Sequence, residues 1–250
     1  MIEITIDGKK AKVEERTTIL NAASGQGIWI PTLCHHPALT TWGSCRVCLV
    51  EIKRGNRVRM VTACNYPIED PIEILTGTER VLRGRQMSME LLLARCPNTP
   101  AVKDLATRLG VSETRFPLED EHCILCGLCV RVCEESIGRS AITFANRGIT
   151  NVVETSFLKA SDDCIGCGAC DFVCPTDCVG MSEEGGVRRF KKWHNEFQMV
   201  NCRECGQPIT TRPHLDYLKK KILLPDYILE LCSDCKRQFY FEKTLSLGHM

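Results

Sequence analysis

The sequence predicts an α+β protein built from several small metal-binding domains, and three observations support this prediction. The 250 residues include 18 cysteines but only 6% aromatic residues. The cysteines fall into four groups that are separated by segments of different character. Apolar residues alternate in the N-terminal segment, whereas the segment after it has helical periodicity. We therefore expect domains that are held together by metal as much as by apolar cores.

Residues 1–75 are predicted to form a β-grasp domain. A hairpin is expected over residues 1–14, because three isoleucines alternate before an Asp-Gly turn. A short helix follows, capped by Thr17 or Thr18. Beyond a cysteine-bearing loop, residues 47–62 are expected to form a second hairpin around a Gly-Asn turn. Two strands, a helix, a loop and two further strands are the elements of a small β-grasp unit.

Residues 76–120 are predicted to be a helical linker. Apolar positions from 78 to 95 follow a helical pattern, which prolines stop at Pro97 and Pro100. A second short helix is expected over 101–109, where Gly110 ends it. The linker contains a single cysteine, Cys96, which is expected to be a structural residue.

The first cysteine group suits a [2Fe–2S] cluster on the loop of the β-grasp domain. Its gaps are 10, 2 and 15 residues, whereas the plant-type pattern has 4 residues in the first gap. A zinc site remains the alternative, because one CxxC pair with two distant cysteines is also a zinc pattern. His35 and His36 are expected to lie beside the site or at the surface rather than to be ligands. The predicted ligands are Cys34, Cys45, Cys48 and Cys64.

A doubled cysteine run within residues 121–186 is the strongest signal in the chain. Both runs have the spacing C-x2-C-x2-C-x3-C, which wraps the backbone around a cubane cluster and fits zinc poorly. We therefore predict a two-cluster bacterial ferredoxin-like domain with two [4Fe–4S] clusters. In this pattern the fourth cysteine of each run serves the other cluster. The predicted ligand sets are Cys123, Cys126, Cys129 and Cys174 for one cluster, and Cys164, Cys167, Cys170 and Cys133 for the other.

Residues 187–250 are predicted to form a small zinc-ribbon-like domain with a mainly helical segment over 214–230. Two CxxC pairs separated by 26 residues are typical of a tetrahedral zinc site. That gap is longer than usual, so a further Fe–S cluster remains the alternative. Cys178, like Cys96, belongs to no group and is expected to be structural. The predicted tail ligands are Cys202, Cys205, Cys232 and Cys235.

Charge and motifs argue against several classes of function. The net charge is +1, and residues 182–250 carry 12 basic and 9 acidic residues, so we expect no nucleic-acid partner. The first ten residues lack the pattern of a signal peptide, and the uncharged stretch over 17–45 is interrupted by glycines, prolines and polar residues. We therefore expect a cytoplasmic protein with reduced thiols and no membrane span. No G-x-G-x-x-G or Walker A motif is present, so flavin and nucleotide are expected to bind a partner, and no catalytic residue is predicted.

Three segments carry a family resemblance: IPTLCHHPALTTWGSCRVCLVEI, CILCGLCVRVCEESIGRSAITFANRG and CIGCGACDFVCPTDCVG. Through them, residues 1–181 resemble the N-terminal region of the large iron–sulfur subunit of complex I, where electrons enter. The same residues resemble the iron–sulfur subunits of NAD-linked [FeFe] hydrogenases. The family pattern has a further [4Fe–4S] site between the two regions, with one histidine and three cysteine ligands. Here that stretch offers Cys96 alone, so we expect this cluster to be absent.

The resemblance implies an iron–sulfur subunit of a multi-subunit NAD(P)-linked flavin oxidoreductase, not catalytic alone. It would relay single electrons from a flavoprotein subunit that binds FMN or FAD and NAD(P). The small size is similar to that of iron–sulfur subunits of Sporomusa-type electron-bifurcating, ferredoxin-dependent transhydrogenases. This likeness adds ferredoxin and a thioredoxin-like [2Fe–2S] subunit as expected partners, and an anaerobic metabolism. A free-standing polyferredoxin that carries electrons between enzymes is the alternative function.

Overall fold

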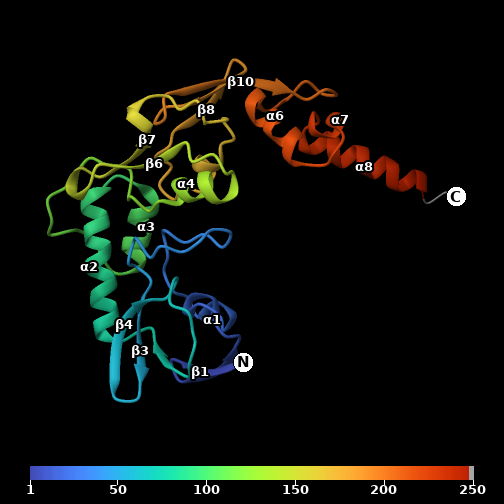
Figure 1. The fold of residues 1–250 in the computed structure, drawn as a ribbon. Helices are drawn as coiled ribbons and strands as arrows, with labels where there is room; N and C mark the ends of the chain where they lie inside the picture. The colour runs from blue at the N-terminus through green and yellow to red at the C-terminus, as the bar shows by residue number, and fades with distance from the viewer. Residues whose placement is uncertain (248–250) are drawn as a thin grey trace. The chain divides into compact units, whose positions relative to one another are not determined.

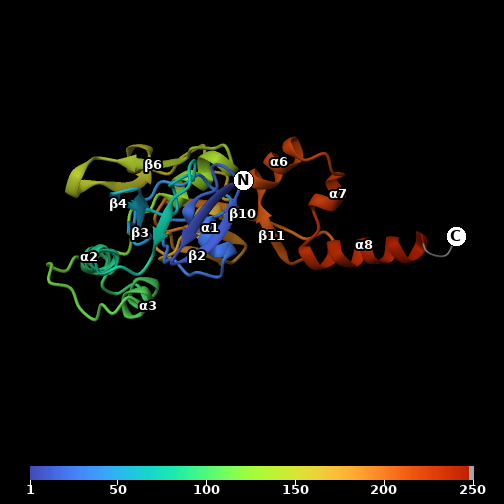
Figure 2. The same ribbon diagram turned by 90° about the horizontal axis from the view of Figure 1, so that it is seen from below.

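A computed structural model describes residues 1–247, so the last three residues of the predicted tail, 248–250, lie outside the described residues (Figures 1 and 2). The chain divides into two compact units. Met1–Ser136 and Val173–Cys178 form the first unit, and Ile137–Phe172 and Val179–Met250 form the second. Within residues 1–247, no helix has both the length and the apolar character needed to cross a membrane.

The first unit opens with a five-stranded sheet in the order β2-β1-β5-β3-β4. β1 pairs antiparallel with β2 and parallel with β5, and β3 pairs antiparallel with both β4 and β5. The two predicted hairpins are confirmed, and the short strand β5 completes a β-grasp sheet. The strands are β1 (Ile2–Ile6), β2 (Lys9–Val13), β3 (Leu49–Arg54), β4 (Arg57–Thr62) and β5 (Glu73–Leu75).

Helix α1 (Ile19–Gly25) packs on one face of this sheet. Its cap is the second of the two expected threonines, because the N–H of Asn21 donates to Thr18 Oγ1 at 3.2 Å. The buried residues Ile19, Ala22 and Ala23 join the isoleucines and valines of the strands in one apolar core. This core supports the loop after α1, which carries the first cysteines.

Helices α2 (Glu79–Arg95) and α3 (Pro100–Arg108) confirm the two helices expected within residues 76–120, and α2 lies on the side of the sheet away from α1 (Figure 1). Thr78, the cap of α2, donates a hydrogen bond to Glu51 on β3 at 2.7 Å. Arg85, which is 4% exposed, donates to the carbonyl of Leu49 at 2.9 Å. The linker is therefore bonded to the sheet and belongs to the first unit.

Short elements carry the doubled cysteine run. The first run enters α4 (Leu128–Arg131) and the single π-helical turn η1 (Val132–Ser136). In the second unit, a hairpin and two 3-10 turns precede the second run, which passes through α5 (Ala169–Phe172) before its last cysteine, Cys174. The hairpin strands are β6 (Ile142–Ala145) and β7 (Val152–Thr155), and the turns are η2 (Gly148–Thr150) and η3 (Ser156–Leu158).

The rest of the second unit is a four-stranded antiparallel sheet in the order β11-β10-β9-β8, followed by three helices. The predicted helical segment over 214–230 is divided into α6 and α7, because the chain between them contains Pro225, the cap of α7. The strands are β8 (Met181–Glu184), β9 (Val187–Phe190), β10 (Asn195–Asn201) and β11 (Pro208–Thr211). The helices are α6 (Arg212–Lys221), α7 (Asp226–Leu229) and α8 (Ser233–Leu247).

Candidate iron–sulfur and metal centres

The structure brings together the four N-terminal cysteines in the first unit. Cys34 and Cys45 lie in the loop after α1, Cys48 precedes β3, and Cys64 follows β4; all four are buried. The N–H of Cys45 donates to Cys34 Sγ at 3.4 Å. Hydrogen bonds with Cys45 and Cys64 lower the pKa of Cys34, and the bond to Cys34 raises the pKa of Cys64. Thiols that already share protons are well placed to bind one metal centre when those protons leave.

One of the two predicted [4Fe–4S] ligand sets lies within the first unit. Cys123, Cys126 and Cys129 belong to it, and so does the segment Val173–Cys178, which carries Cys174. Burial raises the pKa of Cys126 to about 12, and the charges of Cys174 and Cys123 also raise it. This is the grouping that the crossed ligand pattern requires for one cluster.

The other predicted set is divided between the two units. Cys164, Cys167 and Cys170 lie before and within α5 of the second unit, whereas Cys133 lies on η1 of the first. Their grouping around a second cluster therefore stays a prediction from the spacing.

The two runs share a backbone conformation at matching positions. Leu125 and Gly127 in the first run have φ of +53° and +70°, and Gly166 and Gly168 in the second have φ of +67° and +83°. When a residue with left-handed backbone angles stands next to one with right-handed angles, their successive N–H groups point to the same side. These N–H groups can then bind a sulfide or thiolate. Leucine rarely adopts positive φ. At Leu125 the backbone carbonyl accepts a hydrogen bond from Ser44 Oγ of the N-terminal cysteine loop, at 3.2 Å.

Arg131 and Glu135 join the same two cysteine segments. Arg131 is 1% exposed, and its guanidinium donates to the carbonyl of Cys34 at 2.9 Å and to the carbonyl of Thr40. Glu135 accepts a hydrogen bond from the N–H of Thr40 at 2.8 Å. The loop that carries Cys34 is therefore bonded to the helical turns of the first run. Reasoning from the sequence missed both residues; their only signal was one charge inside the first cysteine run, Arg131, and one just after it, Glu135.

In the second unit, the strands of the tail support the loop of the second run. Arg188 on β9 is 8% exposed and donates to the carbonyl of Gly166 at 2.6 Å, while Glu183 accepts from the same guanidinium at 2.8 Å. Thr211 on β11 donates to the carbonyl of Ile165 at 2.5 Å. The tail therefore supports the loop of the second run through hydrogen bonds, in addition to forming its own cysteine group. The sequence did not predict this support.

Replacement of Gly166 by alanine is expected to destabilise this loop. A Cβ there would lie 2.6 Å from the ring of Phe197 and 2.8 Å from Thr211 Cγ2. We expect a loss of about 1 kcal/mol from the positive φ and of about 1–3 kcal/mol from overpacking. Gly185→Ala is the matched control, because its φ is +59° and nothing lies within 4 Å of its Cβ position. Chemical denaturation measures both variants, and equal stabilities would contradict the prediction.

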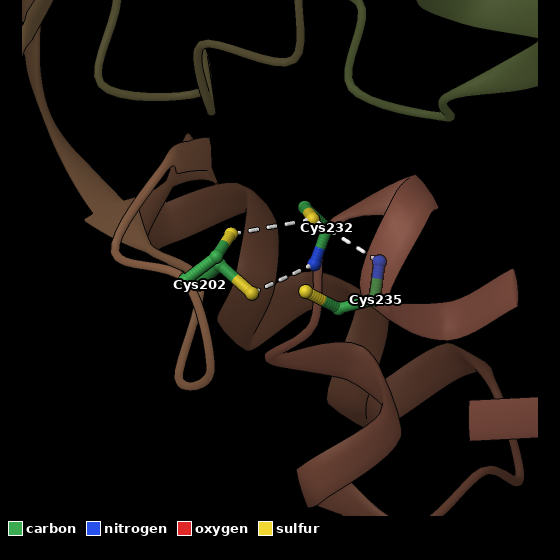
Figure 3. A group of neighbouring side chains, drawn as sticks. Cys202, Cys232 and Cys235 are labelled. Atoms are coloured by element: carbon green, nitrogen blue, oxygen red, sulfur yellow. Dashed lines mark hydrogen bonds between the residues drawn. The ribbon is translucent and has the colours of Figure 1, made fainter. Parts of the chain in front are cut away.

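The four tail cysteines form a compact sulfur group that could hold one metal ion. The first pair lies in the turn between β10 and β11, and the second pair lies at the start of α8 rather than in a second hairpin. Their sulfur atoms all lie within 4.8 Å of one another. Figure 3 shows the sulfur atoms of Cys202, Cys232 and Cys235 facing one another. Cys205 Sγ lies 3.6 Å from Cys232 Sγ.

These distances fit a single tetrahedral ion. Zinc binds thiolate sulfur at about 2.3 Å, which places tetrahedral ligands about 3.8 Å apart. A cubane cluster binds each thiolate through a separate iron, so its ligands lie farther apart. N–H groups also point at the sulfurs: Cys232 N donates to Cys202 Sγ at 3.2 Å, and Cys235 N donates to Cys232 Sγ at 3.4 Å. The N–H groups of Cys205 and Cys232 lower the pKa of Cys202 to about 6, which favours the thiolate that a metal needs.

Two family models match parts of the chain. A 2Fe-2S iron-sulfur cluster binding domain matches residues 1–79, and a 4Fe-4S dicluster domain matches residues 117–181. Both domains are therefore present, in agreement with the cysteine patterns. Both matched regions end before the tail, so the metal in the tail stays a prediction.

The relatives belong to the enzyme groups that the sequence resembles. The NADPH-Fe(3+) oxidoreductase subunit alpha of Geobacter sulfurreducens is 37% identical over 179 residues, which cover 62% of this chain and 21% of that protein. A subunit of the NADH-quinone oxidoreductase of Rhizobium meliloti is 33% identical over 180 residues, which cover 61% of this chain and 21% of that subunit. The mitochondrial 78 kDa subunit of NADH-ubiquinone oxidoreductase from Candida albicans is 28% identical over 174 residues, which cover 59% of this chain and 24% of that subunit.

A solved structure agrees with these relatives. An NAD+-reducing [NiFe]-hydrogenase in the H2-reduced state has a TM-score of 0.54 and 28% identity, covering 62% of this chain and 75% of that one. The resemblance to complex I and NAD-linked hydrogenases is thus confirmed, although this hydrogenase is a [NiFe] enzyme rather than an [FeFe] one. The chain spans about a fifth of the length of the curated relatives it matches.

Proposed function

We propose that this chain, with its 2Fe-2S cluster binding domain and its 4Fe-4S dicluster domain, is an iron–sulfur electron-transfer subunit of a multi-subunit NAD(P)-linked flavin oxidoreductase. The observation that carries this proposal is the hydrogen-bonded contact between the loop of Cys34 and the first dicluster run. A relay needs its centres held at fixed positions. Ser44 and Arg131 supply those bonds in a chain whose relatives include NADPH- and NADH-linked oxidoreductase subunits.

In this proposal the cysteines hold three clusters, and iron–sulfur clusters supply one-electron oxidation and reduction. The chain's residues would bind these clusters, fix their orientation and shield them from water. Each of the four N-terminal cysteines is at most 6% exposed, so water is excluded from that site. The proposed ligands are Cys34, Cys45, Cys48 and Cys64 for [2Fe–2S], and the two crossed sets Cys123, Cys126, Cys129 and Cys174, and Cys164, Cys167, Cys170 and Cys133, for [4Fe–4S].

The tail is proposed to hold a structural zinc ion. Its four sulfurs have the spacing of a mononuclear tetrahedral site, and the ion would fasten the turn between β10 and β11 to the start of α8. The backbone also links these parts, because Arg203 N donates to the carbonyl of Glu230 at 3.0 Å. A zinc-ribbon-like role of this kind would keep the strands that support Gly166 in place.

The finer proposal concerns the complex around the chain. A partner flavoprotein would accept two electrons as a hydride from NAD(P)H and release them singly, one of them reaching a low-potential ferredoxin and the other a second acceptor. A thioredoxin-like [2Fe–2S] subunit is a further proposed partner, and the proposed location is the cytoplasm of an anaerobic cell. The support for the flavoprotein partner is the resemblance of residues 1–181 to subunits of complex I and of NAD-linked hydrogenases.

Metal analysis combined with EPR tests the cluster assignment. Anaerobically purified chain is expected to contain about ten iron atoms and one zinc. The EPR spectrum of the reduced protein should contain one [2Fe–2S] and two [4Fe–4S] signals. About 14 iron atoms without zinc would show a fourth cluster and refute the zinc proposal for the tail.

Purification from the native host separates the subunit function from the polyferredoxin function. The tagged chain is expected to elute with an FMN- or FAD-binding protein, and NAD(P)H is expected to reduce its clusters only when that protein is present. A flavin-free monomer that shuttles electrons between separate enzymes would overturn the proposal. Ferredoxin reduction that depends on a second acceptor would specifically test bifurcation.

A further inference from the structure

Cys178 lies among the proposed ligands of the [4Fe–4S] site in the first unit, although the sequence predicts a purely structural role. Its Sγ lies 3.6 Å from Cys174 Sγ. It is also within hydrogen-bonding reach of Cys123. Both neighbours are proposed ligands of the same cluster, so Cys178 adds a further sulfur beside a site to which the ligand pattern assigns four.

The turn after Cys174 brings Cys178 back to it. Asp177 has φ of +50°, in the left-handed region that aspartate tolerates better than most residues. Thr176 lies 8% exposed inside the turn, with its hydroxyl 3.5 Å from Cys174 Sγ. Cys178 is itself half-buried. The turn therefore holds two thiols side by side where the ligand pattern requires one.

A cubane cluster takes four cysteine ligands, one for each iron, so five sulfurs cannot all bind. We propose that Cys174 and Cys178 are interchangeable ligands of the same iron, an inference that rests on the proposed ligand set. In the exchange, the Fe–S bond to Cys174 breaks as the bond to Cys178 forms. The thiol proton of Cys178 passes to Cys174, and no electron is gained or lost. The site would then keep its fourth ligand when one of the two sulfurs is oxidised or removed.

The internal repeat provides a matched control for this inference. Cys174 is the fourth cysteine of its run, and Cys178 follows it by four residues. The fourth cysteine of the other run is Cys133, and four residues after it stands Ile137. The chain therefore has a spare sulfur at this position in one run and an apolar side chain in the other.

Four variants test the exchange: Cys174→Ala, Cys178→Ala, the double variant and Cys133→Ala. Alanine is chosen because a serine oxygen could itself bind iron. Each protein is purified anaerobically, and its iron content and EPR spectrum are measured. We expect both single variants at 174 and 178 to keep about ten iron atoms, while the double variant and Cys133→Ala each lose up to about four. The [2Fe–2S] signal reports whether the first unit is folded in each protein.

Three results would overturn the exchange. Cys174→Ala could lose as much iron as the double variant, Cys178→Ala alone could lose iron, or Cys133→Ala could keep all of its iron. A wild-type chain that holds fewer than two [4Fe–4S] clusters would instead refute the ligand set and the proposed function. The iron content of the wild type thus distinguishes the two failures.

Discussion

Cys205→Ala is expected to remove one zinc ion per chain and to release α7 and the start of α8 from the turn between β10 and β11, while the iron content stays unchanged. The apolar core around these helices is small, and among the side chains that the structure describes its buried aliphatic residues are Leu215, Ile228, Leu229 and Leu231. Burial of such side chains is worth about 1.5–3 kcal/mol each, against an ordering cost of about 1–2 kcal/mol for each backbone residue. Zinc in small peptide domains contributes about 10–16 kcal/mol of apparent binding free energy. Without the ion, we expect the tail helices to lose their fixed positions.

Cys96→Ala is the matched control for this experiment. Cys96 is fully buried at the end of α2, and burial raises the pKa of its thiol to about 12, so it stays protonated. Its replacement should leave both zinc and iron unchanged. Limited proteolysis and metal analysis compare the two variants. A tail that stays resistant to protease in Cys205→Ala, or a loss of about four iron atoms, would contradict the structural zinc.

The local elements of the first unit could be predicted because their causes are local. Alternating isoleucines before Asp7-Gly8 determine the first hairpin, and Thr18 and Thr78 begin helices by accepting N–H groups of their own first turns. The spacing of the cysteines is local in the same sense. It indicates which sulfurs can share a centre; the structure bonds Cys45 to Cys34 and places the four tail sulfurs within 4.8 Å of one another.

What the sequence did not show depends on contacts between distant residues. Arg131 is hydrogen-bonded to Thr40, 91 residues away in the sequence, and Thr211 is hydrogen-bonded to Ile165, 46 residues away. The strands β8 and β9 were missed because the charged segments MSEE and VRRF lack a clear apolar alternation. Arg188 stands in the basic stretch VRRFKK, yet its guanidinium is buried against the loop of the second run. Only the folded arrangement shows that the tail supports that loop.

Arg131→Met is expected to loosen the N-terminal cysteine loop and to slow electron transfer between the [2Fe–2S] site and the first [4Fe–4S] site. The substitution leaves the carbonyl of Cys34 without its donor in a buried site, at a cost of about 1–3 kcal/mol, and it also removes the donor to the carbonyl of the exposed Thr40. It also removes a cation that lies 5.2 Å from the centre of the Trp42 ring. A loop that is free to shift no longer holds the two centres at a fixed separation.

Arg131→Lys separates the effect of charge from that of position. Lysine keeps the positive charge, which stabilises a reduced and more negative cluster, but it lacks the planar fork that reaches two carbonyls. We therefore expect the lysine variant to restore the reduction potential of the [2Fe–2S] centre without restoring the transfer rate. Redox titration followed by EPR measures the potential, and freeze-quench EPR after rapid reduction measures the rate.

Arg108→Met is the matched control for the arginine variants, because Arg108 also lies against a tryptophan of the loop after α1, 4.1 Å from the Trp29 ring, but at an exposed position. The substitution therefore removes a cation from a ring of the same loop and leaves the buried hydrogen bond to Cys34 in place. Its replacement should change neither the potential nor the rate. If Arg131→Met transferred electrons as fast as the wild type, the bonds between the two loops would not position the centres. If Arg131→Lys restored rate and potential together, charge alone would explain the role of Arg131. Only separate responses of rate and potential would show that the fork of hydrogen bonds holds the relay together.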